Sequence, residues 1–182
     1  MNKTVKLILR IVGIVLAAAG IIQKGYFAIN IFSDDLQPAN NVAVFYIIEA
    51  LGLVAVIVGL AISKYLISQI GVIVYYAAGM LLTIMQLSVS GNIMQMTQLF
   101  YILLEIIIII MIILVMAKTI KPYIAAIVIG GTVIVDGMLF VLQMIIAPGV
   151  NAFSIPIIRD LFIIFAVGAA AVCTCLVSDS KK

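Results

Sequence analysis

The chain has no histidine and no tryptophan, and charged residues make up only 9% of its 182 positions. Without histidine, a histidine metal site or a histidine proton relay is excluded. With so few charges and 66% hydrophobic residues, the chain has too little polar surface for a water-soluble fold. The formal net charge of +3 is too small to favour nucleic acid as a partner. The composition therefore predicts an all-α integral membrane protein, with the lipid bilayer as its main partner.

The sequence is also poor in groups that carry out chemistry. Its only cysteines are Cys173 and Cys175, and two residues that are two apart on a helix point in divergent directions. We interpret both as packing residues and not as a disulfide. No nucleophile stands beside a base, and no glycine-rich phosphate loop follows a strand. We therefore expect no enzymatic activity, no cofactor and no metal site.

What the sequence does have is apolar runs, with room for about six spanning helices of roughly 20 residues each. The first run, 11–22, follows three basic residues; such a start is also typical of a secretory signal peptide, but we interpret it as the first membrane helix. Residues 23–41 form the longest polar connection, although 26–32 is apolar enough to extend the first helix or to lie at the membrane interface. The other helices are predicted at 42–62, 65–87, 99–117, 123–146 and 155–177. Together they make residues 1–182 a single membrane domain.

Basic residues gather at one end of the predicted helices. The lysines and arginines on that side are Lys3, Lys6, Arg10, Lys64, Lys118, Lys121, Lys181 and Lys182. Only Lys24 and Arg159 lie on or near the other side. The positive-inside rule then places both termini and the two short turns in the cytoplasm. We predict a multi-pass protein of the cell membrane, whether plasma or inner membrane.

The chain contains three similar two-helix units, at about 5–62, 65–117 and 122–177. Gly20, Gly79 and Gly137 lie at matching positions, in Ala-Ala-Gly for the first two and Gly-Met-Leu for the last two. Phe45-Tyr46 matches Phe100-Tyr101, and Glu49 matches Glu105 and then Asp160. Because each unit returns to the same side, the three units are predicted to be parallel, around an axis along the membrane normal. The three glycines would be equivalent points of close helix packing.

These units resemble those of the HdeD-like acid-resistance membrane proteins. The resemblance rests on an aromatic start, an acid-then-glycine helix, and a return helix with a hydrophobic–Asp–Gly–hydrophobic signature. The residues concerned are Phe45-Tyr46, Glu49, Gly52, Gly59 and Val135-Asp136-Gly137-Met138. The family usually has Pro-Gly between paired helices, where this chain has Ser63-Lys64 and Lys121-Pro122. The resemblance implies six helices and a role in acid or stress tolerance, and it brings no catalytic residues.

Four carboxylates fall within the apolar runs: Glu49, Glu105, Asp136 and Asp160. Counted at ~1.5 Å per residue from the predicted helix ends, all four belong to the outer half of the membrane. Arg159 is the only basic residue near that level. Charges at such depth are costly, so they normally face the bundle interior or a watery cavity, paired or protonated.

Two interpretations of these carboxylates are open. In the structural one, the glutamates are protonated or hydrogen-bonded to Tyr46, Tyr101 or Gln86, and Arg159 pairs with Asp136. In the functional one, the acids form an outward-facing site that exchanges protons or binds a small cation, since desolvation favours the protonated carboxyl. The candidate site residues are Glu49, Glu105, Asp136, Arg159 and Asp160.

Three roles are consistent with this pattern. The first is an acid- or stress-tolerance protein of the HdeD-like type. The second is the membrane-embedded solute-binding subunit of a small-molecule importer for a vitamin-type solute, with an outer pocket built from Asp136, Arg159, Asn92 and Gln143. The third is a structural accessory subunit of a membrane complex. A membrane protein partner or a homo-oligomer fits any of the three.

Overall fold

The computed structural model describes residues 2–33, 37–87, 92–146 and 154–178, and six helices account for nearly all of them. In chain order they are α1 (Lys3–Ser33), α2 (Gln37–Ala61), α3 (Tyr65–Leu87), α4 (Asn92–Met116), α5 (Pro122–Ile146) and α6 (Ile155–Ser178). Each contains a stretch long and apolar enough to cross a membrane. The prediction of an all-helical chain with six helices long and apolar enough to span a membrane is confirmed.

The main correction to the sequence prediction concerns α1. This helix continues to Ser33, so the start of the expected polar connection is helical, and of the two alternatives for 26–32 the extension of the first helix is the one observed. The apolar residues 26–32 carry it on, and a single lysine before them does not interrupt it, because a helix satisfies its backbone hydrogen bonds internally. Helices α2 and α4 also begin earlier than predicted, at Gln37 and Asn92. At ~1.5 Å per residue, α1 is roughly 46 Å long.

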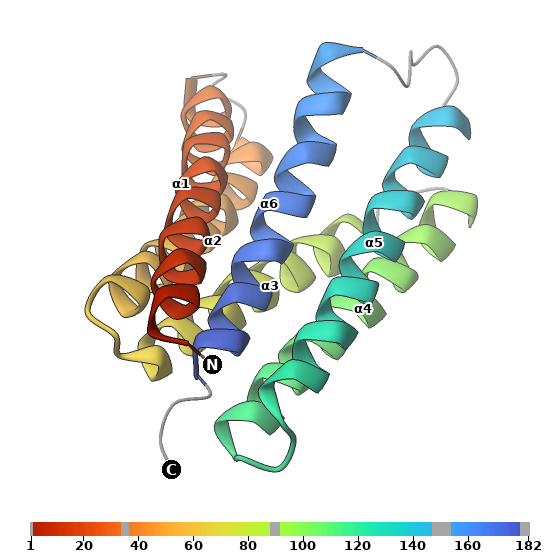
Figure 1. Ribbon diagram of the computed structural model, residues 1–182. Coiled ribbons are helices and arrows are strands. Elements are labelled where there is room, and N and C mark those ends of the chain that lie inside the picture. The colour runs from red at the N-terminus through yellow and green to blue at the C-terminus, as the bar shows by residue number, and fades with distance from the viewer. Residues whose placement is uncertain (1, 34–36, 88–91, 147–153, 179–182) are drawn as a thin grey trace.

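The helices form a ring (Figure 1). Each packs against its neighbours in sequence, and α6 closes the ring by packing against α1. Helices α3 and α6 also touch across the middle. Of the six, α6 is the most buried, and its inner residues are mostly small, among them Ala166, Gly168, Ala170 and Ala171. Small side chains let the other helices approach α6 closely.

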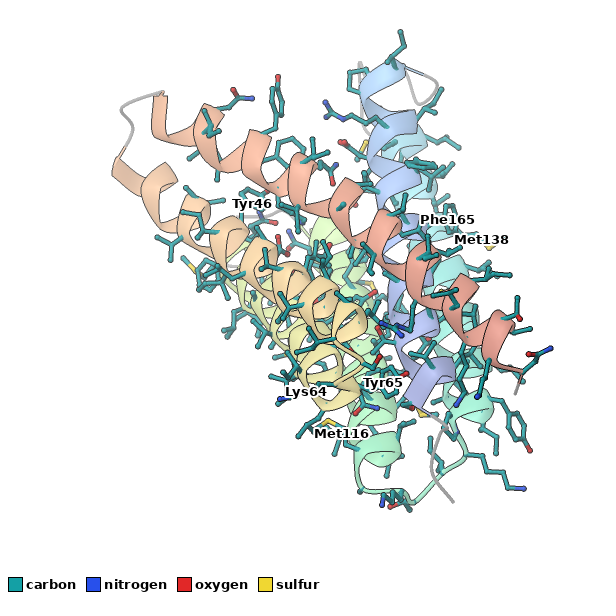
Figure 2. The ribbon with its side chains drawn as sticks, turned by 60° about the vertical axis from the view of Figure 1, so that its left-hand side comes forward. Tyr46, Lys64, Tyr65, Met116, Met138 and Phe165 are labelled. Carbon is teal, nitrogen blue, oxygen red and sulfur yellow. The ribbon has the colours of Figure 1, made fainter. Side chains whose placement is uncertain are left out.

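The surface of the bundle is apolar and its interior mixes apolar and polar groups. Large apolar residues such as Ile22, Ile127 and Met138 are about 70% exposed, and Figure 2 shows Met138 and Phe165 on the flank formed by α5 and α6. In a bilayer these side chains contact lipid tails, which are as apolar as the side chains themselves. Within the ring, Leu53 and Ile112 are almost fully buried.

Two short turns, α2–α3 and α4–α5, lie at the same end of the bundle, where Figure 2 labels Lys64, Tyr65 and Met116. Both turns fall where the sequence predicted them. Ser63 and Lys118 have φ of 58° and 57°, the left-handed conformation that commonly ends a helix. The starting end of α1 and the final end of α6 lie at this end too (Figure 1).

Arg10 of α1 donates hydrogen bonds to the C-terminal end of α2. Its Nε donates to the Leu60 carbonyl at 2.7 Å, and its Nη2 donates to the Ala61 carbonyl at 2.6 Å. The last carbonyls of a helix have no partner within the helix, and a cation there is favoured by the helix dipole. One of the predicted cytoplasmic charges therefore has a structural role.

Candidate functional site

A cavity of about 240 Å³ lies inside the ring, and all six helices contribute to its wall. Most of its wall on α1 to α5 is polar or aromatic. Those residues are Lys24 of α1; Tyr46 and Glu49 of α2; Tyr75, Tyr76, Thr83 and Gln86 of α3; Tyr101 and Glu105 of α4; and Asp136 of α5. Three of the five candidate residues predicted from the sequence, Glu49, Glu105 and Asp136, thus surround one space.

Lys24 forms a buried ion pair in the cavity. Its Nζ lies 2.7 Å from Glu49 Oε2, and the Lys24 and Glu49 side chains are only 15% and 4% exposed. The same nitrogen lies over two tyrosine rings, 5.1 Å from the centroid of Tyr46 and 5.4 Å from that of Tyr75. Carboxylate pairing and cation–π attraction together compensate for burying an ammonium group.

Sequence analysis missed the role of Lys24. We placed this residue in a polar connection, whereas the extended α1 carries it into the ring beside Glu49 of α2. A signal was available, because the lysine is followed directly by the apolar segment 26–32. A single charge with apolar residues on both sides is typical of an intramembrane functional position.

Glu49 and Glu105 meet at Gly79 of α3. A methyl group added at Gly79 would lie 2.6 Å from Glu105 Oε1 and 3.1 Å from Glu49 Oε1. At this glycine we expected a neighbouring helix backbone to approach, but the groups that approach are two carboxylates. Any larger residue at position 79 would displace at least one of them.

Among the described residues, two of the three cavity carboxyls form no ion pair. Glu105 Oε2 is buried, and among the described residues it receives no hydrogen bond. Among these residues, neither Glu105 nor Asp136 forms an ion pair, whereas Glu49 pairs with Lys24. In a membrane interior such groups are costly unless they are paired, protonated, bound to a cation or in contact with water.

Arg159 and Asp160, the other two predicted site residues, do not line this cavity. They pair with each other, with Arg159 Nη2 2.9 Å from Asp160 Oδ1. Gln23 Nε2 of α1 donates to the same oxygen at 2.8 Å, so this cluster joins α1 to α6. The Arg159 guanidinium lies over the ring of Phe27, 5.5 Å from its centroid. Of the partners expected for Arg159, the observed one is Asp160, whereas Asp136 lines the cavity.

The expected hydrogen bonds from tyrosine to the glutamates are replaced by other contacts. The Tyr101 hydroxyl donates to Gln143 Oε1 at 3.2 Å. Tyr46 packs against Phe27, with ring centroids 5.5 Å apart. The pocket predicted for the importer therefore does not form as expected, since Gln143 bonds Tyr101 and Arg159 bonds Asp160. The side chain of Asn92 lies outside the described residues.

The match of Glu49, Glu105 and Asp160 in the sequence does not extend to their surroundings. Glu49 is the central residue of α2, and Glu105 lies near the centre of α4. Asp160 is only the sixth residue of α6. The first two acids share the cavity, and the third belongs to the α1–α6 contact, so one explanation does not serve all three positions.

In the described part of the chain, no group of three or more histidine, cysteine or acidic side chains is arranged to hold a metal. The rings of Tyr46 and Tyr75 present their faces to the Lys24 ammonium, the arrangement in which aromatic rings attract a cation.

Comparisons of the chain with protein-family models, curated proteins and solved structures give no match. The resemblance to HdeD-like proteins stays a prediction from short motifs.

Proposed function

We propose that this protein is a membrane-embedded binding protein for a small organic cation, with protons as the competing occupant of the same carboxyls. The observation that carries the proposal is the cavity in which Glu49, Glu105 and Asp136 converge from three helices with one lysine among them. Three carboxylates against one ammonium leave two acids to be neutralised. A low-dielectric site with that imbalance favours a positively charged ligand.

The aromatic wall supports an organic cation as the ligand. Tyr46, Tyr75, Tyr76 and Tyr101 all line the cavity. Rings of this kind attract ammonium groups through their faces and also contact the alkyl part of a ligand. Lys24 provides an internal example, because its ammonium is held by one carboxylate and two of these rings.

The solute-binding role fits this cavity better than a purely structural role does. A structural ion pair needs one carboxylate for the one lysine, and the cavity has two more. The acid-tolerance role implied by the HdeD-like resemblance draws on the same groups, since carboxyls that exchange a cation for a proton respond to external pH. From the positive-inside rule we propose that both termini lie in the cytoplasm, and from the rise per residue that the cavity carboxyls belong to the outer half of the bilayer.

The proposal is tested by measuring cation binding to the full chain in lipid nanodiscs. We expect saturable binding of n-butylammonium by isothermal titration calorimetry, and no binding of the neutral alcohol n-butanol. Glu105→Gln removes a cavity carboxyl that has no basic partner, so it should abolish binding while the protein still accumulates in the membrane.

The matched control for Glu105→Gln is Asp160→Asn. This change also turns an acid into its amide, but at a residue outside the cavity. It should leave n-butylammonium binding intact. Equal loss in both variants, or equal binding of n-butanol, would refute the proposal.

A further inference from the structure

The two halves of the cavity are built from matching residues of the first and second repeats. On α2, Tyr46 and Glu49 are three residues apart; on α4, Tyr101 and Glu105 are four apart. Both spacings place the ring and the carboxyl on the same face of a helix. All four side chains line the cavity. We call the side with Tyr46 and Glu49 the Glu49 half and the side with Tyr101 and Glu105 the Glu105 half.

The two halves differ in the residue at the position of Lys24. Lys24 comes four residues after Gly20, and the residue four after the matching Gly79 is Thr83. Thr83 also lines the cavity, but its short side chain donates to its own helix, to the Gly79 carbonyl at 3.0 Å. The Glu49 half thus contains a lysine of this protein. The Glu105 half has Thr83 at the matching position, and the Thr83 hydroxyl already donates a hydrogen bond within its own helix.

The Glu105 half keeps the acceptor that an ammonium needs. Glu105 Oε2 is buried and receives no hydrogen bond from the described residues. Asp136 lines the cavity from α5 and forms no ion pair within the same ranges. The Tyr101 hydroxyl is directed to Gln143, so what this residue offers the cavity is its ring.

We infer that the Glu105 half is a binding site for the primary ammonium group of a small aliphatic amine, and that Lys24 is its tethered counterpart in the Glu49 half. This inference rests on the proposed function and makes it specific. The ligand's ammonium pairs with Glu105 and Asp136, beside the ring of Tyr101. Its alkyl part faces the apolar wall at Leu82, Ile164 and Val167.

Because Lys24 already neutralises Glu49, the ligand class is a monoamine. An amine with a second ammonium group would bring that charge against Lys24, and like charges at short range repel strongly in a low-dielectric site. The lysine therefore acts as a selectivity element as well as a partner for Glu49.

The first test supplies the Glu105 half with its own lysine. Thr83→Lys should place an ammonium beside Glu105 and weaken n-butylammonium binding about tenfold or more. Thr83→Met, of similar length and without charge, is the matched control and should retain more of the affinity. Equal affinity in the two variants, with Glu105→Gln still abolishing binding, would overturn this inference and leave the proposed function standing.

The second test removes the Lys24 ammonium and supplies n-butylammonium from solution in its place. Lys24→Thr gives the Glu49 half the residue of the Glu105 half, and its loss of thermal stability should be reversed by n-butylammonium and not by n-butanol. Reversal by both compounds, or by neither, would overturn the inference. Because the readout is stability of the membrane protein, this test holds even if Thr83→Lys fails to accumulate. An absence of cation binding by the unmodified protein would overturn the proposed function itself.

Discussion

Gly79 is the residue on which the geometry of the carboxylates depends. Its hydrogen leaves room for two carboxylate oxygens that a methyl group would contact at 2.6 and 3.1 Å. The atoms in the way are the ends of flexible side chains, so they can move without displacing a helix. The position therefore controls the site more than the fold.

Gly79→Ala should weaken n-butylammonium binding about tenfold and leave the thermal stability of the protein nearly unchanged. The reason is that the added methyl group pushes the Glu105 carboxylate out of its place. The control is Gly131→Ala on α5, where an added methyl group meets no atom within 4 Å. Binding that is the same in both variants would show that the carboxylate position is not important.

At this scale the sequence was a partial guide. It singled out Glu49, Glu105, Asp136 and Gly79, because charges and repeated glycines are conspicuous in apolar runs. It did not identify Lys24 as the partner of Glu49, because the two lie on different helices and their pairing depends on how α1 packs against α2. It gave Asp136 and the acids of the return helices as partners of Arg159, and the observed partner is one of the latter, the adjacent Asp160.

At the scale of helices, α2 and α3 make the closest contact in the bundle. Gly52 and Gly71 lie so near each other's helices that a methyl group on Gly52 would be 2.8 Å from the Gly71 carbonyl oxygen. Further along, a methyl group on Gly59 would overlap the Ser68 backbone nitrogen. Backbone atoms cannot move aside as side chains can, so this contact fixes the distance between the two helices.

Gly59→Ala should therefore destabilise the protein by about 1–3 kcal/mol, the usual range for overpacking a tight contact. Thermal unfolding in detergent measures the effect, again against Gly131→Ala. Because Glu49 is carried by α2 and Tyr75 by α3, the variant should also weaken cation binding. Stability equal to that of Gly131→Ala would mean that α2 and α3 can separate at no cost.

The helices themselves were largely predictable from hydropathy. The prediction of α3 was correct at both ends, and the two short turns were found, because long apolar runs bounded by lysines leave few alternatives. The errors lie at the end of the bundle away from the short turns, at the end of α1 and at the starts of α2 and α4. These helices continue into polar segments. Hydropathy marks the part of a helix that contacts lipid, and it cannot mark where a helix stops once it has left the lipid tails.

At the scale of the whole molecule, charge distribution predicts orientation. The short turns, the start of α1 and the end of α6 share one end of the bundle, and most lysines and arginines lie in or next to these segments in the sequence. In a variant without Cys173 and Cys175, a new cysteine from Ser154→Cys should react with a membrane-impermeant maleimide on intact cells. A cysteine from Lys64→Cys should react only after permeabilisation. The reverse pattern would place the termini outside.

The central claim is that a cation and protons compete for the cavity carboxyls. It is tested most directly by counting protons released when n-butylammonium binds near neutral pH, from calorimetry in buffers of different ionisation enthalpy. The account predicts proton release on binding, because Glu105 and Asp136 have no basic partner in the described chain and exchange a proton for the ammonium. Binding with no proton release, or the same release from Glu105→Gln, would contradict it.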